Sequence, residues 1–197
     1  MNPYSPLTRS DLYSLEKYSQ IRSDFRQQVM AHKSNRRLAL GEHVMLYFED
    51  SMTMHYQIQE MLRAERIFES EGIEEELAAY NPLIPDGNNL KATMMVQYAD
   101  VQERIEALSR LIGLEDKVWL QVRGHERVYP ICDEDLERDN EEKTSAVHFL
   151  RFEFSDAMIA DLKAGKPLAG GVDHPNYSAT VDPVAENIAG ALTRDFK

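Results

Sequence analysis

Hydrophobic residues recur along the first third of this chain with the three-to-four-residue spacing of amphipathic helices. Thr8 and Asp11 form an N-terminal capping pair, so the sequence predicts a long first helix from Thr8 to about Lys33. A second helix is expected over Ser51–Glu69, where the apolar residues share one face, and Gly72 marks its end. Shorter helices are expected over residues 73–80, 100–113 and 155–164, and from residue 182 onward.

Other segments alternate apolar and polar residues, which is the pattern of half-buried strands. Strands are expected over His43–Glu49, Ala92–Tyr98, Val118–Val122, Arg127–Ile131, Val147–Phe154, Leu168–Asp173 and Tyr177–Val181. Several of these are joined by short turns, and strict strand–helix–strand alternation is missing. The sequence therefore predicts an α+β fold with a long N-terminal helix, a mainly antiparallel sheet and helices packed on one face of it.

The length of 197 residues fits a single globular domain spanning residues 1–197. The side chains on the apolar faces should form its core. The predicted contributors are Leu15, Phe25, Leu46, Phe48, Ile58, Leu62, Ile105, Trp119, Leu150 and Phe152.

One charged residue lies within the apolar face of the second predicted helix. On a helical wheel Glu65 is about 20° from Met54. A carboxylate buried there needs a partner, a proton or a ligand, because burying an unpaired charge is very costly. Arg22 lies similarly within the apolar arc of the first helix, so the two side chains are expected to pair. This pair is either a structural ion pair or part of a binding site.

The polar flank of the second helix concentrates amides and charges. Candidate ligand- or partner-binding residues are Arg22, Gln57, Gln59, Glu60, Arg63, Glu65 and Arg66. The alternative is a solvated face with local charge pairs such as Glu60 with Arg63. The basic segment His32–Arg37 likewise fits either a solvated helix end or a subsite for a phosphate or carboxylate.

Three residues are candidate metal ligands, although the histidines have no metal-ligand spacing. His148 shares a strand face with apolar residues, and Asp173 and His174 lie at a tight turn. With Glu65 they could form a carboxylate–imidazole site for zinc or iron. The alternatives are a core histidine and a turn stabilised by local hydrogen bonds. Nucleophilic catalysis has less support, because no GxSxG motif is present.

Composition narrows the classes of partner. Acidic residues number 34 and basic residues 22, giving a net charge of −12, which disfavours nucleic acid and anionic membrane surfaces as partners. No apolar run is long enough to span a bilayer, and the N-terminus has no secretory signal pattern. Cys132 is the only cysteine, so neither an intramolecular disulfide nor a cysteine-rich zinc site is expected. A soluble, cytoplasmic protein is the expectation.

Several phrases resemble an uncharacterised bacterial family, a domain of unknown function. They are RRLALGEHVMLYFE (36–49), YQIQEMLRAE (56–65), YNPLIP (80–85), KTSAVHFLRF (143–152) and GVDHPNY (171–177). The resemblance covers essentially the whole chain. It implies a single-domain soluble protein of a family whose genes often lie beside rubrerythrin-like and iron–sulfur oxidoreductase genes, and it assigns no catalytic residues.

The sequence therefore predicts a binding or accessory protein in a redox or stress-related pathway, with a protein partner or a small anionic ligand. The alternative is a metal-binding protein or enzyme with a carboxylate–imidazole site around Glu65 and His148 or His174. The sequence names no cofactor and leaves the oligomeric state open.

Overall fold

The computed structural model describes residues 4–135, 138 and 142–197. The described α-helices are α1 (Leu15–Ser34), α2 (Ser51–Ala64), α3 (Ser70–Tyr80), α4 (Val101–Arg110), α5 (Asp156–Lys163) and α6 (Glu186–Thr193). The described strands are β1 (Arg37–Leu40), β2 (Val44–Glu49), β3 (Asn89–Val96), β4 (Val118–Val122), β5 (Ile131–Cys132), β6 (Val147–Glu153), β7 (Leu168–His174) and β8 (Tyr177–Val181). Short 3₁₀ turns lie at Arg9–Asp11, Asn81–Leu83 and Glu115–Lys117.

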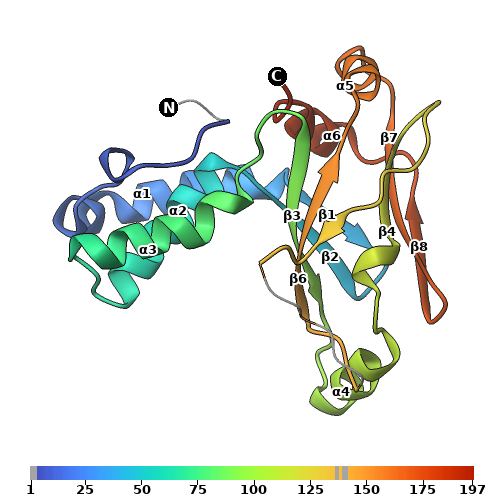
Figure 1. The fold of residues 1–197 in the computed structure, drawn as a ribbon, viewed down its shortest axis with the longest axis horizontal. Helices are drawn as coiled ribbons and strands as arrows, with labels where there is room; N and C mark the ends of the chain where they lie inside the picture. Colours follow the sequence, from blue (N-terminus) through green and yellow to red (C-terminus); the bar gives the residue numbers. More distant parts are fainter. Residues whose placement is uncertain (1–3, 136–137, 139–141) are drawn as a thin grey trace.

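The strands form two antiparallel sheets. The larger has the order β1-β2-β3-β6-β5 and the smaller β4-β7-β8. Leu46 and Phe152 of the larger sheet share one buried hydrophobic cluster with Leu120 and Val172 of the smaller sheet. The two sheets therefore bury their apolar faces against each other and make the β body of the molecule (Figure 1).

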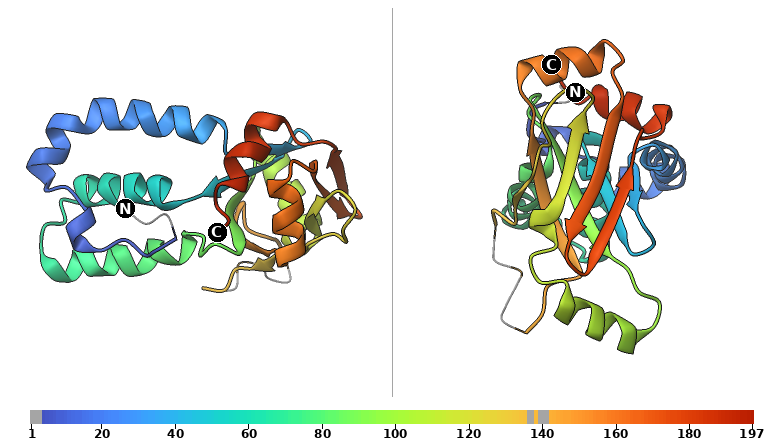
Figure 2. Two further views of the ribbon diagram at one scale, coloured as in Figure 1. Left: turned by 90° about the horizontal axis from the view of Figure 1, so that it is seen from above. Right: turned by 90° about the vertical axis from the view of Figure 1, so that its right-hand side faces the viewer.

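Helices α1, α2 and α3 form an arm that extends away from the β body (Figures 1 and 2). The arm has its own hydrophobic cluster, in which Ile58 and Leu62 of α2 pack with Leu77 of α3. Few residues of α1 are buried; Tyr18 and Val29 are the two that become fully enclosed. Helix α1 is therefore held to α2 by a small set of contacts, which include the packing of the Phe25 ring on His55 and Tyr56.

Arg36 joins the arm to the β body. It lies between α1 and β1 and is 2% exposed. Its guanidinium donates to the carboxylate of Asp195 after α6, with Nη1 to Oδ1 at 3.0 Å, and to the carbonyl oxygens of Phe48 and Glu49, each at 3.0 Å. The Asp50 carboxylate at the start of α2 lies 3.4 Å from its Nε. The basic segment 32–37 thus provides a buried structural anchor at Arg36.

The predicted α+β class is confirmed, with antiparallel pairing throughout both sheets. The capping pair Thr8–Asp11 also forms, with the Thr8 amide 2.8 Å from Oδ2 of Asp11. It begins only a 3₁₀ turn, however, and α1 starts separately at Leu15, where Ser14 is the N-cap. The single-domain prediction stays a prediction.

The strands differ from the expectation in two places. Strand β1 was not expected, although Leu38 and Leu40 alternate with exposed neighbours and pair with β2. The predicted hairpin between β4 and residues 127–131 is reduced to one bridge, Leu120 with Val128. Strand β4 pairs with β7 instead. Part of the acidic segment 133–143 lies outside the described residues.

Ile105 was expected in the core, and this is wrong: its side chain is 55% exposed. Helix α4 projects below the β body (Figure 1) and turns Val101, which is 58% exposed, and Ile105 outward. Its opposite side contacts the body through Ala107 and Leu111, which are buried. Among the described residues, no helix is long and apolar enough to cross a membrane.

Candidate functional site

Arg22 and Glu60 form an ion pair between α1 and α2. Nε of Arg22 lies 2.7 Å from Oε1 of Glu60, and Nη2 lies 2.7 Å from Oε2. The Tyr18 hydroxyl donates to the same Oε1 at 2.7 Å. The Arg22 guanidinium, assisted by Tyr18, lowers the pKa of Glu60 to about 2. Arg22 therefore has a carboxylate partner on α2, as expected, but the partner is Glu60.

The expectation that Glu65 points into the core is wrong, because Glu65 is exposed. Helix α2 ends at Ala64, and Arg66 has the left-handed φ of 57° that is typical of glycine after a helix end. The Ile67 amide donates to the Leu62 carbonyl at 2.9 Å, which is the 6→1 hydrogen bond typical of a Schellman motif. The helical wheel does not apply beyond this end, so Glu65 and Arg66 lie at the exposed tip of the arm.

The glutamines of α2 have different environments. Gln59 is 0% exposed, and its side-chain oxygen accepts the Tyr13 amide at 2.6 Å while its nitrogen donates to the Tyr13 carbonyl at 3.3 Å. Gln59 thus fastens the segment before α1 and is not available to a ligand. Gln57 is partly exposed.

An open groove of about 880 Å³ follows the polar side of α1. It is lined by Ser19, Arg22, Ser23, Arg26, Gln27 and Met30 of α1 and by Arg63 of α2. Among the described residues, neither Arg26 nor Arg63 has a hydrogen bond or an ion pair, and both are exposed. Arg22 and Arg63 were expected as binding residues. Arg26 lines the same groove but has no sequence signal for binding, because it lies on the first helix among other polar residues.

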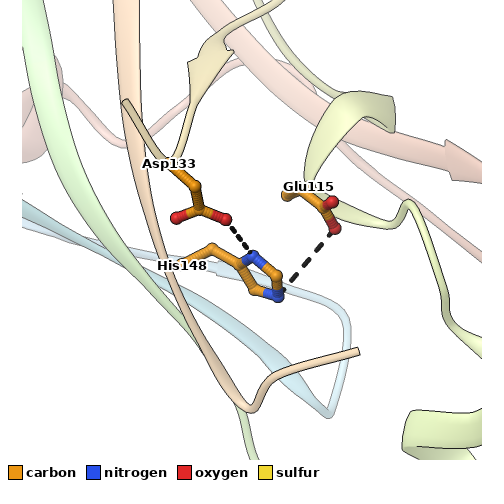
Figure 3. Close-up of side chains that lie close together, drawn as sticks. All are labelled: Glu115, Asp133 and His148. Atoms are coloured by element: carbon orange, nitrogen blue, oxygen red, sulfur yellow. Dashed lines mark hydrogen bonds and ion pairs between the residues drawn. The ribbon is translucent and has the colours of Figure 1, made fainter. Parts of the chain in front are cut away.

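His148 of β6 lies between two carboxylates inside the β body (Figure 3). It is 0% exposed. Its Nδ1 is 2.6 Å from Oδ2 of Asp133, and its Nε2 is 3.9 Å from Oε2 of Glu115. One potential ligand atom from each of these three residues lies within 4.8 Å of the others. The Thr144 hydroxyl is 2.8 Å from Nε2, and the Ser145 carbonyl is 3.1 Å away.

Three separate segments bring these groups together. Glu115 begins the 3₁₀ turn before β4, and Asp133 follows β5 with a left-handed φ of 48°. The Asp133 amide donates to the Phe149 carbonyl, and Oδ1 of Asp133 accepts the Phe149 amide, both at 2.8 Å. Asp133 is thereby fixed across β6 beside the imidazole. Burial and nearby carboxylates raise the pKa of the Cys132 thiol, which disfavours a thiolate there.

His174 and Asp173 do not join this cluster. The Asn176 amide donates to Nδ1 of His174 at 3.2 Å, and Nε2 of His174 donates to the Ile112 carbonyl at 3.1 Å. Both ring nitrogens are therefore engaged by the backbone, as in a structural histidine. Asp173 pairs with Arg127 at the surface. The expected convergence of these two residues with His148 and Glu65 is wrong. The true neighbours, Glu115 and Asp133, had no sequence signal.

The fold and these sites define an α+β protein with a two-sheet body, a polar cluster inside it and a helical arm with an arginine-lined groove. The chain belongs to the family described as "Protein of unknown function (DUF3501)", which it matches over residues 6–196. It is similar to a solved structure described as a novel protein of unknown function from Burkholderia pseudomallei K96243. The two are 50% identical, with a TM-score of 0.93 over 98% of this chain and 100% of that chain. No curated protein matches.

Proposed function

We propose that this protein is a binding or accessory protein that uses the groove on α1 to hold an acidic segment of a partner protein. The observation that carries the proposal is the charge of the groove. Three guanidinium groups, those of Arg22, Arg26 and Arg63, line it, whereas the whole chain has a net charge of −12. Glu60 forms its ion pair with Arg22, and Arg63 acts on it only at longer range, so Arg26 and Arg63 face solvent without a hydrogen bond or ion pair among the described residues.

The chemistry of the groove suits carboxylates. Guanidinium groups form paired hydrogen bonds with carboxylates and phosphates. Ser19 and Ser23, one turn apart on α1, add hydroxyl donors beside Arg26, and Met30 adds an apolar contact at the end of the groove. The open shape fits an extended or helical segment better than a small molecule, which pockets usually enclose. A small anion is the alternative ligand.

The partner is proposed to belong to a redox or stress-related pathway in the bacterial cytoplasm. The support for this pathway is the gene neighbourhood implied by the family resemblance. The support for the kind of binding is the groove itself. The two parts of the proposal can therefore fail separately.

A labelled oligoglutamate peptide tests the groove directly by fluorescence anisotropy. We expect Arg26→Glu combined with Arg63→Glu to weaken binding by about tenfold or more, because two attractive charges become repulsive. Arg22 is left intact, since it holds α1 against Glu60. The matched control reverses Lys17 and Lys117, two exposed lysines outside the groove.

Binding should also weaken as salt increases. Equal binding by the wild type and the arginine variant would refute the proposal. Competition by inorganic phosphate at concentrations below those of the peptide would instead identify a small anion as the ligand of the groove.

A further inference from the structure

The cluster around His148 has the arrangement of a metal-binding histidine with its supporting carboxylate. Asp133 holds one side of the imidazole, since its Oδ2 is 2.6 Å from Nδ1. An Asp133 carboxylate accepts and cannot donate, so Nδ1 carries the proton and donates to it. The lone pair of the other nitrogen, Nε2, then lies beside the Thr144 hydroxyl at 2.8 Å, with the Glu115 carboxylate 3.9 Å from the same nitrogen. Metal-ligating histidines almost always donate their second ring N–H to a carboxylate or carbonyl in this way.

The distance between Nε2 and Glu115 fits a shared ion better than a hydrogen bond. At 3.9 Å, Nε2 and Oε2 are too far apart for a hydrogen bond. Two ligands at typical bond lengths of about 2.1 Å from one ion are about 3.4 Å apart at a tetrahedral angle. A small rotation of the Glu115 side chain is enough to shorten the separation of Nε2 and Oε2 from 3.9 Å to this value.

Two more oxygen donors surround the same point. The Thr144 hydroxyl and the Ser145 carbonyl lie 2.8 and 3.1 Å from Nε2. A carbonyl oxygen beside an unprotonated nitrogen makes no hydrogen bond, because both are acceptors. A cation between Nε2 and the Ser145 carbonyl, or a proton on Nε2, makes the contact between these two groups favourable. A cation is favoured by the second carboxylate, because Glu115 is 7% exposed and the Asp133 side chain only 10% exposed, so the imidazole lies between two little-exposed carboxylates.

Asp133 itself is better suited to orientation than to direct binding. Its Oδ1 already accepts the Phe149 amide at 2.8 Å, and Arg138 lies 3.5 Å from the same oxygen. The donor set that remains is one imidazole and several oxygens, with no thiolate. Such a set suits Mn²⁺, Fe²⁺ or Zn²⁺. Because His148 is fully buried and Thr144 is 1% exposed, the site is closed in the manner of a structural metal.

We propose that Nε2 of His148 and the carboxylate of Glu115, with the hydroxyl of Thr144, bind one divalent transition-metal ion, and that Asp133 orients the imidazole. The site is independent of the groove on α1. It also replaces the arrangement expected from sequence, since His148 is kept as a ligand while Glu65, Asp173 and His174 are not.

Metal content and binding test the proposal in the full-length protein. Purified protein is stripped with EDTA, and Co²⁺, Mn²⁺ and Zn²⁺ are added separately. We expect one equivalent of ion by elemental analysis, a rise in Tm, and for Co²⁺ a visible absorption band. Ligand binding to the folded state alone raises Tm by mass action.

Glu115→Gln keeps the size of the side chain and removes its charge, so it should abolish the stoichiometric ion and the Tm rise. Asp116→Asn, at the exposed neighbouring position, is the matched control and should bind like the wild type. Asp133→Asn should keep the stoichiometry and weaken affinity by about 10- to 100-fold, as expected of an orienting group.

The proposal is overturned if stripped wild-type protein neither binds an ion nor changes Tm, or if the Glu115 and Asp116 variants bind equally. If Glu115→Gln does not fold, the wild-type titration decides the question alone. In that case an unchanged Tm on adding all three ions refutes the site.

Discussion

The buried contact between Arg36 and Asp195 gives a sharp test of what joins the arm to the β body. We consider Asp195→Asn, which removes the carboxylate hydrogen-bonded to the buried guanidinium and leaves Asp50, 3.4 Å from Nε, as the remaining carboxylate. Breaking a buried ion pair in this way costs about 3–5 kcal/mol. Arg36 keeps its bonds to the carbonyls of Phe48 and Glu49. We therefore expect the lower end, about 3 kcal/mol.

Arg36→Met removes all of the side-chain hydrogen bonds of the guanidinium and leaves Asp195 buried, at 8% exposure. The expected loss is about 5 kcal/mol, the upper end of the range for a broken buried pair. The double variant should lose less than the sum of the single losses, because neither charge is then left without its partner. These losses are large against a total stability of about 5–15 kcal/mol.

Urea unfolding followed by circular dichroism measures these differences, with the midpoint and slope fitted for each variant. The control pair is Arg123 with Asp182, which is 3.2 Å apart but 61% and 52% exposed. Asp182→Asn should cost less than about 1 kcal/mol, as expected for a surface ion pair. The reasoning is refuted if Asp195→Asn costs no more than this control.

Three further predictions use single substitutions. Gly171→Ala should lower the free energy of unfolding, measured in urea, by about 3 kcal/mol, because the new Cβ would lie 2.4 Å from a carbon of the buried Trp119 indole. Gly190→Ala in α6 meets open space and should raise it by up to about 1 kcal/mol; equal effects of the two substitutions would contradict this. Ile105→Glu should change stability by less than about 0.5 kcal/mol if α4 is exposed as described, and a larger loss would return Ile105 to the core. Arg22 lowers the pKa of Glu60 from 4.5 to about 2, so the ion pair should stabilise the wild type relative to Glu60→Gln above pH 4.5. The difference in Tm between the two should shrink as the pH falls toward 2, and a pH-independent difference would argue against the ion pair.

Where a capping residue and an apolar period coincide, the sequence was sufficient to predict the element. Helix α4 begins after Asp100, whose carboxylate accepts the Glu103 amide at 2.9 Å, and α5 begins after Ser155 in the same way. Strands β2 and β6 were recognised because buried residues alternate with more exposed ones along most of their length. Strand pairing was harder, since β4 and β7 meet across a long stretch of chain.

The error at Glu65 has a definite physical origin. Placing it in the core required α2 to continue past Ala64, and no glycine or proline there signals an end. The end is set by Arg66 in a left-handed conformation, which few non-glycine residues adopt. Packing of Ile67 against the hydrophobic cluster of the arm accompanies this end and depends on tertiary structure.

His148 was found from sequence, but its partners were not, because the cluster has no sequence spacing. Glu115 lies at a short turn, and Asp133 reaches the imidazole only because its backbone turns back after β5. Metal motifs are readable when one element carries two ligands at a fixed interval, as on a helix. Here each ligand comes from a different segment, so only the folded arrangement identifies the site.

The two proposed sites differ in how they relate to stability. The His148 cluster lies within the β body, so an ion bound there would stabilise the same core that holds its ligands. Helix α1 is different, since it buries few residues and is held by the packing of Phe25 on α2 together with the polar contacts that Glu60 and Gln59 make with the segment from residue 13 to 22. These contacts occupy the side of α1 facing α2 and leave Arg26 free to meet a partner. The residues that hold the arm together are therefore separate from those that give the groove its unpaired charge.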